Sequence, residues 1–253
     1  MKDIVFASDL DNTLLHSLRR RREGDICVER NKGREQGFMT PGTIRLLEEA
    51  GKTLTLIPVT TRSIEQYRRI EWPHGTEPEY AVTTNGAVLL RRGRIDEAWR
   101  RNQEARITPC REELLAQYET QSKKEAYIRC RLVDESYLFA YCADGVSVEE
   151  TAEKCRRETL LTVQHSGRKI YFFPPGLDKG LAVKMLRERF PGKRICAAGD
   201  SCIDVPLLRE ADLAFAHREL ESAALGEAAH IRRQEGEGNF AEWLLEQLLL
   251  PMP

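Results

Sequence analysis

Two aspartates near the amino end of the chain are the first residues whose types and spacing point to chemistry. Asp9 and Asp11 stand two residues apart in the segment Asp-Leu-Asp-Asn-Thr, directly after the apolar run 4–7. A strand that delivers two carboxylates to a loop can hold a cation and a nucleophile at the sheet edge where open α/β folds keep their sites. The pattern predicts phosphoryl chemistry, although Asp-Asn-Thr also suits a turn and the motif is loose by itself.

Three further signals follow in chain order. Thr60 follows the apolar run 54–59, and Lys179 stands where a helical pattern begins. Asp200 and Asp204 lie in the segment Gly-Asp-Ser-Cys-Ile-Asp, after another strand-like run. Because the carboxyl ends of neighbouring parallel strands meet at one edge, these residues are expected to converge with the first two aspartates. Taken alone, each residue has an ordinary structural explanation, such as a threonine at the end of a strand or an acid favoured by a helix dipole. The prediction therefore depends on their joint occurrence.

The elements that must position these residues alternate as in a parallel α/β fold. A helix opens at Pro41 and should end near Gly51, and a strand is expected over 54–59. The spacing of a capping box at 63–66 predicts a helix just beyond Thr60. Nearer the carboxyl end, the expected elements are helices over 181–190 and 205–208, strands over 195–198 and 213–216, and a final helix after Asn239.

The segment 87–174 has a different rhythm and predicts an inserted α+β domain. Its first two strands should form a hairpin at an Arg-Gly turn, and two αββ units follow with both helices on one side of the sheet. The core is therefore expected to be split into 1–86 and 175–253, with an insert of order ββ-αββ-αββ. The expected pieces are helices over 112–121 and 148–160 and strands over 126–132, 137–142, 161–164 and 169–173.

Composition and charge narrow the classes of function. Lys and Arg number 39 against 40 Asp and Glu, so no overall field favours nucleic acid or an anionic membrane. No uncharged run approaches the roughly 18 residues that a membrane helix needs. Seven cysteines without a C-x-x-C pair predict free thiols in a reducing compartment. We therefore expect a cytoplasmic protein that binds neither nucleic acid nor membrane.

Together, these motifs resemble those of the haloacid dehalogenase superfamily of phosphohydrolases. The likeness is to the branch with a type 2 cap, Cof-like and sucrose-phosphatase-like, in which the cap lies between the second and third motifs. It covers almost the whole chain and implies a Rossmann-like core with a parallel sheet, an inserted α+β cap and a Mg²⁺ cofactor. The chain departs from the family at one position, because many type 2 members read G-D-x-x-N-D and Ile203 replaces the asparagine here.

The resemblance implies a catalytic role for four residues. Asp9 would be the nucleophile that forms an aspartyl-phosphate. Asp11 would protonate the leaving alkoxide and then deprotonate the water that hydrolyses the intermediate. Thr60 would donate hydrogen bonds to the phosphoryl oxygens, and Lys179 would balance the clustered carboxylates and the charge of the transition state.

The resemblance also implies how substrate and metal are held. Thr61 and Arg62 would bind substrate beside Thr60, and Asn85 would contact phosphate or substrate where the chain enters the cap. The implied metal site consists of Asp9, Asp200 and the carbonyl of Asp11, with Asp204 holding a bound water or orienting the site.

Two cationic features each have a structural and a functional interpretation. Four consecutive arginines, 19–22, open a charged segment that extends to Gln36 and should contain a hairpin. This segment is either a solvated loop or a basic flap that helps to recognise an anionic substrate. Arg129 and Arg131 alternate on one face of an insert strand, with Tyr171 on a neighbouring strand, and that face meets either solvent or substrate.

The expected activity is therefore that of a Mg²⁺-dependent phosphatase acting on a small phosphorylated metabolite. The resemblance to sugar and sucrose phosphatases makes a sugar phosphate the first class of substrate to test. A phosphotransferase similar to the phosphomannomutases is one alternative, and a non-catalytic ligand-binding regulator is another. The presence of Asp11 favours catalysis, because a binding protein has no need of a proton-shuttling carboxylate.

Overall fold

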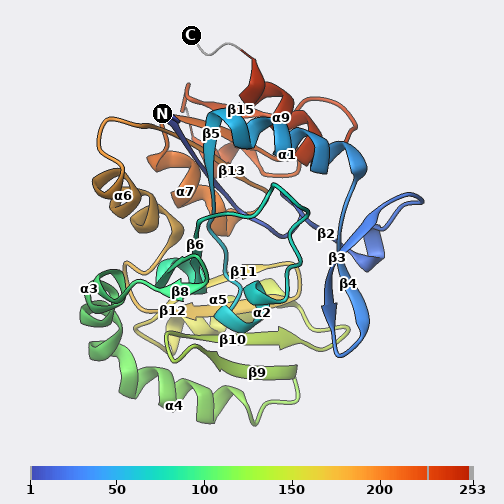
Figure 1. The fold of residues 1–253 in the computed structure, drawn as a ribbon. Coiled ribbons are helices and arrows are strands. Elements are labelled where there is room, and N and C mark those ends of the chain that lie inside the picture. Colours follow the sequence, from blue (N-terminus) through green and yellow to red (C-terminus); the bar gives the residue numbers. More distant parts are fainter. Residues whose placement is uncertain (1, 227, 251–253) are drawn as a thin grey trace.

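A computed structural model describes residues 2–226 and 228–250, and its centre is a five-stranded parallel sheet (Figure 1). The strand order is β15-β14-β13-β1-β5, so β1 lies between β13 and β5. Ser8 at the end of β1 pairs with Ala198 on one side and Pro58 on the other. The three strands that precede the predicted motifs therefore end side by side. The strands are β1 (Ile4–Ser8), β5 (Leu54–Pro58), β13 (Arg194–Gly199), β14 (Leu213–Ala216) and β15 (Ile231–Arg233).

Helices cover both faces of this sheet (Figure 1). Successive side chains of β1 alternate between the two faces: Phe6 packs in the cluster with α1 and α9, and Val5 and Ala7 pack in the cluster with α6 and α7. The core helices are α1 (Pro41–Thr53), α2 (Ile64–Arg68), α6 (Lys179–Arg189), the 3-10 turn η4 (Cys202–Asp204), α7 (Val205–Glu210), α8 (Ser222–Leu225) and α9 (Phe240–Leu249).

The local helix signals are confirmed at most positions. Both hydrogen bonds of the predicted capping box between Ser63 and Gln66 are present at the start of α2. Helix α1 begins at Pro41 as expected but continues past Gly51 to Thr53. Glycine weakens a helix interior by only about 1 kcal/mol, which packing of the other residues offsets.

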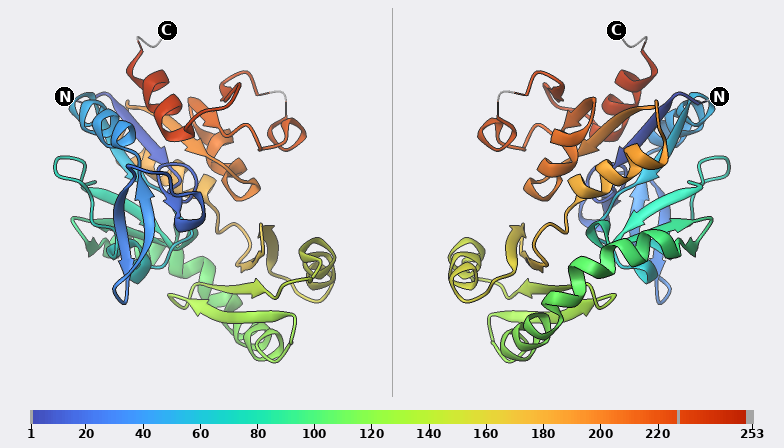
Figure 2. Two further views of the ribbon diagram at one scale, coloured as in Figure 1. Left: turned by 90° about the vertical axis from the view of Figure 1, so that its right-hand side faces the viewer. Right: turned by 90° about the vertical axis from the view of Figure 1, so that its left-hand side faces the viewer.

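The insert contains a four-stranded antiparallel sheet of order β11-β12-β10-β9, set apart from the core (Figure 2). Helices α4 and α5 pack on one face of this sheet, around a cluster that includes Leu138, Ile170 and Phe172. The open-faced sheet expected from the sequence is therefore confirmed. Its elements are α4 (Arg111–Gln121), β9 (Tyr127–Val133), β10 (Tyr137–Cys142), α5 (Val148–Arg157), β11 (Thr162–Ser166) and β12 (Lys169–Phe173).

The hairpin at the start of the insert forms as predicted but pairs with the core side. Strand β7 (Val88–Arg91) pairs with both β8 (Arg94–Ile95) and β6 (Tyr80–Thr83), and Val82 in β6 bridges to Val59 just after β5. The first two strands of the expected ββ-αββ-αββ order thus adjoin the core, while the limits 87–174 remain a prediction. The short turn η2 (Thr84–Gly86) lies between β6 and β7. The chain then reaches α4 through two elements that the sequence did not predict, helix α3 (Glu97–Ile107) and turn η3 (Thr108–Cys110).

The arginine-rich segment forms a flap, here defined as residues 16–39. Strands β3 (Ile26–Asn31) and β4 (Arg34–Met39) form the expected hairpin, and β2 (His16–Ser17) joins them before the 3-10 turn η1 (Leu18–Arg20). In Figure 2 the flap, drawn in blue, projects from the core toward the level of the insert.

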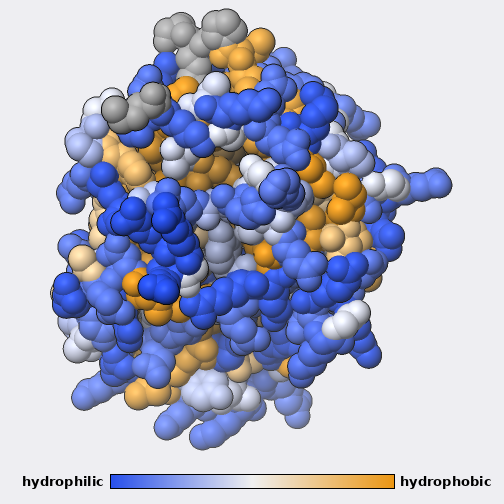
Figure 3. All heavy atoms as spheres, in the orientation of Figure 1, coloured by the Kyte–Doolittle hydropathy of each residue, from blue (hydrophilic) through white to orange (hydrophobic). Residues whose placement is uncertain are grey.

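All seven cysteines are free. Among residues 2–226 and 228–250, no helix combines the length and apolarity needed to cross a membrane. The face seen in Figure 3 is mostly hydrophilic, with hydrophobic residues in small groups.

Candidate active site

A buried lysine joins two of the predicted acids. Lys179 Nζ donates hydrogen bonds to Asp9 Oδ1 at 2.5 Å and to Asp204 Oδ1 at 2.6 Å. Lys179 is 1% exposed and is the first residue of α6, a helix capped by Asp178. Burial would lower the pKa of Lys179, but the charges of Asp204 and Asp9 raise it above its usual value. The ammonium group therefore stays charged between the two carboxylates.

The predicted nucleophile occupies an electrostatically unfavourable place for an anion. Burial raises the pKa of Asp9 to about 7; Lys179 opposes this increase, while the charges of Asp204 and Asp11 add to it. The second oxygen of Asp9 accepts a weak hydrogen bond from Thr13 Oγ1 at 3.4 Å. Additional positive charge beside Asp9 would favour its ionised, nucleophilic form.

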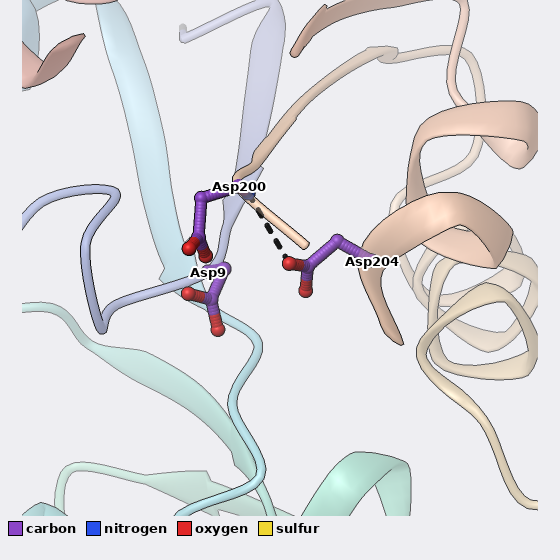
Figure 4. A group of neighbouring side chains, drawn as sticks. All are labelled: Asp9, Asp200 and Asp204. Atoms are coloured by element: carbon purple, nitrogen blue, oxygen red, sulfur yellow. Dashed lines mark hydrogen bonds between the residues drawn. The ribbon is translucent and has the colours of Figure 1, made fainter. Parts of the chain in front are cut away.

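Asp9, Asp200 and Asp204 form an acidic triad whose carboxylate oxygens lie within 4.8 Å of one another (Figure 4). Asp204 Oδ2 is occupied, because it accepts hydrogen bonds from the amides of Asp200 and Ser201 and from the Ser201 hydroxyl. Gly199 permits this approach, since a Cβ there would lie 2.3 Å from the Cβ of Asp204. Asp204 thus suits the orienting role predicted for it.

Asp200 is the acid of the triad without a cationic partner among the described residues. Its carboxylate accepts only a long hydrogen bond from Asn12 Nδ2, at 3.4 Å. Burial, together with the charges of Asp204 and Asp9, raises the pKa of Asp200 well above its usual range. Hard oxygen donors with excess negative charge are the donor set that Mg²⁺ prefers, so these residues fit the predicted metal.

Asp11 lies outside the triad and is paired with Arg62. Arg62 donates from Nε and Nη2 to the two oxygens of Asp11, at 2.9 and 2.8 Å. The side chain of Asp11 is 42% accessible, and partial removal from water would raise its pKa. The Arg62 guanidinium outweighs this effect and holds the pKa of Asp11 well below its usual range. Arg62 also donates from Nη1 to Glu29 at 2.8 Å. Glu29, a flap residue that is 3% exposed, was not anticipated, because a lone acid in a charged segment carries no signal.

The other predicted site residues lie nearby but make different contacts. Thr60 is fully buried, and its Oγ1 accepts a hydrogen bond from the Arg62 amide at 3.1 Å, which leaves the hydroxyl proton for another acceptor. The Thr61 carbonyl accepts from the Tyr137 hydroxyl at 2.5 Å, a contact between core and insert. Asn85 is buried, and its Nδ2 donates to the Leu177 carbonyl at 3.3 Å. A substrate contact by Asn85 remains a prediction.

A pocket of about 590 Å³ opens beside Asp11, between the core, the flap and the insert. Of the insert residues predicted to meet substrate, Arg131 and Tyr171 line it and Arg129 does not. Lys169 also lines the pocket and was missed, although its position two residues before Tyr171 on β12 places both on one face of the sheet. The remaining insert residues that line the pocket are Tyr137, Phe139 and Tyr141.

The departure from the family pattern at Ile203 has a structural explanation. Ile203 is 4% exposed and packs in a cluster with Tyr137, Tyr171 and Phe173 of the insert. An asparagine side chain at this position would place an amide among aromatic rings. Ile203 therefore joins the core to the insert through apolar contact and takes no part in polar binding.

Comparison with known proteins places this architecture. No protein-family model matches the sequence, and no curated protein matches it. The sucrose-phosphatase of Synechocystis sp. PCC6803, solved with sucrose and phosphate, is 18% identical with a TM-score of 0.70, over 98% of this chain and 97% of that one. A haloacid dehalogenase-like hydrolase from B. subtilis is 16% identical with a TM-score of 0.62, over 100% of both chains. A trehalose-6-phosphate phosphatase related protein is 15% identical with a TM-score of 0.60, over 96% of both. The chain thus has the fold of the haloacid dehalogenase phosphatases, with a Rossmann-like core and a cap.

Proposed function

We propose that this protein is a Mg²⁺-dependent phosphatase that hydrolyses a small phosphate monoester through an aspartyl-phosphate on Asp9. One observation carries the proposal: Asp9 is held by buried Lys179 beside Asp200 and Asp204, at the sheet edge next to Asp11. If Lys179 only formed a structural ion pair with Asp9 and Asp204, the fold would need neither Asp200 beside them nor Asp11 at the edge of a pocket.

The residues divide the reaction into two displacements. A carboxylate oxygen of Asp9 attacks phosphorus, and the bond from phosphorus to the leaving oxygen breaks. Asp11 gives a proton to that leaving oxygen, then accepts a proton from the water that attacks the aspartyl-phosphate. Inorganic phosphate leaves, and both carboxyl groups return to their starting states. Thr60 and Lys179 donate to oxygens that gain charge in the transition state.

Arg62 has to release Asp11 for this proton transfer. In the structure its guanidinium holds Asp11 ionised, which is unsuited to a general acid. Arg62 also lines the pocket, where it can exchange the Asp11 carboxylate for oxygens of a bound phosphate ester. Substrate binding would then free Asp11 to take up the proton that it delivers.

Asp9, Asp200 and the carbonyl of Asp11 would hold Mg²⁺, with Asp204 orienting the site. When bound, the ion neutralises repulsion between the anionic ester and the carboxylates. The charge imbalance at Asp200 supports this assignment.

A sugar phosphate is the first class of substrate to test. Sucrose-phosphatase and a trehalose-6-phosphate phosphatase related protein share the fold, and the pocket is within the size range of small-molecule sites. We also propose a cytoplasmic protein without a nucleic-acid or membrane partner, supported by the net charge of −1.

The test is release of inorganic phosphate from a panel of phosphate esters, with Mg²⁺ or with EDTA. We expect Mg²⁺-dependent release that falls by a factor on the order of 10³ or more in Asp9→Asn, because the nucleophile is lost. The matched control is Asp144→Asn, which changes an aspartate whose side chain is 93% exposed.

Three outcomes would contradict the proposal. Equal activity in Asp9→Asn would exclude Asp9 as the nucleophile. Phosphoryl exchange stimulated by a sugar bisphosphate, without net phosphate release, would indicate the phosphotransferase alternative. Ligand binding without turnover of any ester would indicate the regulator.

A further inference from the structure

Every carboxylate that lines the pocket already has a cationic partner. Asp11 and Glu29 share Arg62, and Glu29 also accepts from Arg69 Nε at 3.2 Å. Glu35 pairs with two other arginines of the flap. Arg62 and Arg69 thus neutralise Asp11 and Glu29, and the two flap arginines neutralise Glu35, so the acids of the pocket wall are balanced from within the protein.

Three other cations line the same pocket without a carboxylate partner among the described residues: Arg19, Arg131 and Lys169. Arg19 lies on the flap, and the other two lie on the insert sheet. The remaining arginines of the run 19–22 do not line this pocket. The pocket wall therefore carries three cations with which no carboxylate of the described chain forms an ion pair.

Arg131 is held in place at the pocket wall. Its Nη2 donates to Gln66 Oε1 at 2.7 Å, and its guanidinium lies 5.5 Å from the centroid of the Phe139 ring. Its Nε is buried without a hydrogen-bond partner among the described residues. A buried charged donor without a partner is costly, and an anionic ligand would remove that cost.

Lys169 lines the pocket together with Asp11. Strand register places Lys169 beside Tyr141 and places Arg131 beside Phe139, so aromatic rings of β10 lie between the two cations. A ligand that spans the pocket from Asp11 outward would meet Lys169, these rings and Arg131.

The scissile phosphate does not account for these cations. Asp9, Lys179, Asp200 and Asp204 surround the position of phosphoryl transfer, and none of them lines this pocket. The pocket begins at Asp11, the residue proposed to protonate the leaving oxygen. It therefore receives the leaving group, and a neutral sugar would leave the three cations unpaired.

We infer that the leaving group carries a negative charge of its own, a carboxylate or a second phosphate, which Lys169 and Arg131 bind over the aromatic rings of β10. Arg19 faces the same group from the flap. The inference rests on the proposed phosphatase function and narrows its substrates to phosphate esters of anionic alcohols. It also assigns a substrate role to Arg131 and to one arginine of the run.

The test uses pairs of esters that differ in one charged group. One pair is 3-phosphoglycerate and glycerol 3-phosphate, and the other is fructose 1,6-bisphosphate and fructose 1-phosphate. We expect kcat/KM for the more acidic member to exceed that of its partner by about tenfold or more, the effect of one charge-assisted hydrogen bond. The pair with the larger ratio distinguishes a carboxylate from a second phosphate.

Variants locate the preference on named residues. Lys169→Gln and Arg131→Gln are expected to lose more activity on the more acidic ester of each pair than on the ester whose alcohol is uncharged. The ratio of the two kcat/KM values should therefore fall toward one. Arg129→Gln is the matched control, because Arg129 lies on the same strand as Arg131, two residues away, but outside the pocket. This control should keep the ratio of the unchanged protein.

Failure of the inference and failure of the proposed function give different results. Equal kcat/KM within both pairs, or equal losses on both esters in the variants, would overturn the inference while the phosphatase stands. If p-nitrophenyl phosphate and all panel esters resist hydrolysis, the phosphatase proposal fails. Calorimetric binding of 3-phosphoglycerate and glycerol 3-phosphate to the same protein then decides the charge preference, and equal affinities would overturn it.

Discussion

The proposed catalytic centre and the neighbouring pocket have opposite charge imbalances. At the centre, Asp9 and Asp204 share the single ammonium of Lys179, and Asp200 has no cationic partner among the described residues. In the pocket each acid forms an ion pair, whereas Lys169 and Arg131 form none within the part of the chain that the structure describes. These opposite imbalances are the basis of the two proposals, a cation at the centre and an anion in the pocket.

The two regions also differ in how they are built. The centre lies at the ends of adjacent strands of one sheet, and Lys179 and Asp204 are buried there. The pocket is lined by the core, the flap and the open face of the insert sheet. We therefore expect changes at the centre to affect both stability and activity, and changes in the pocket to affect mainly the choice of substrate.

The largest effect on stability is expected at the centre. Lys179→Met leaves two buried carboxylates without their shared partner, and we expect the free energy of unfolding to fall by about 3–5 kcal/mol. Urea denaturation in EDTA measures it. The matched control is Lys184→Met on the same helix, because Lys184 is 61% exposed and pairs with Glu210. The control should change by less than about 0.5 kcal/mol, and an equal loss in both variants would contradict the comparison.

A smaller effect is expected where core and insert meet. Ile203→Asn buries an amide in the aromatic cluster, so the free energy of unfolding should fall by about 1–3 kcal/mol. Cleavage of the insert by a protease at low concentration should become faster, because the contact that joins the two parts is weakened. Ile203→Val keeps the cluster apolar and serves as the control, and similar proteolysis of both variants would show that Ile203 does not join the two parts.

The smallest effect on the free energy of unfolding is expected at an ion pair outside both regions. This pair shows how much an ordinary ion pair contributes to the stability of this chain. Asp96 caps α3 by accepting from the Trp99 amide at 3.0 Å and pairs with Arg189 at 2.8 Å. Burial would raise the pKa of Asp96, but the Trp99 amide and Arg189 hold it below its usual value of 3.8. Its contribution to stability is therefore complete well above pH 3.8 and is lost as pH falls through the lowered folded pKa.

Asp96→Asn keeps a side-chain cap but removes this titration. We expect it to lower the free energy of unfolding by about 1 kcal/mol at pH 7 and by progressively less as the pH is lowered below 3.8. Urea denaturation from pH 7 to pH 3 checks this dependence. Glu49→Gln is the control, because the Arg45–Glu49 pair is exposed and 4.0 Å apart. A constant difference across the pH range would show that ionisation of Asp96 is not the cause.

The sequence was sufficient to predict that the candidate site residues lie at one edge of the parallel sheet. Asp9, Thr60 and Asp200 each follow a short apolar run, and the carboxyl ends of neighbouring parallel strands meet at one edge. The antiparallel sheet of the insert was also readable, because alternation and turn residues are local signals. Helix α3 escaped prediction because its charged residues give little apolar periodicity.

Only the tertiary structure could decide which charges are compensated. Glu29, Arg62 and Lys169 come from the flap, the core and the insert, and their partners depend on how these parts pack together. The sequence by itself determined which residues stand at the ends of strands, because strand and loop signals depend on neighbours along the chain. Only the structure shows which cations of the pocket form no ion pair with a described residue, because ion pairing depends on distances in space between residues far apart in the sequence.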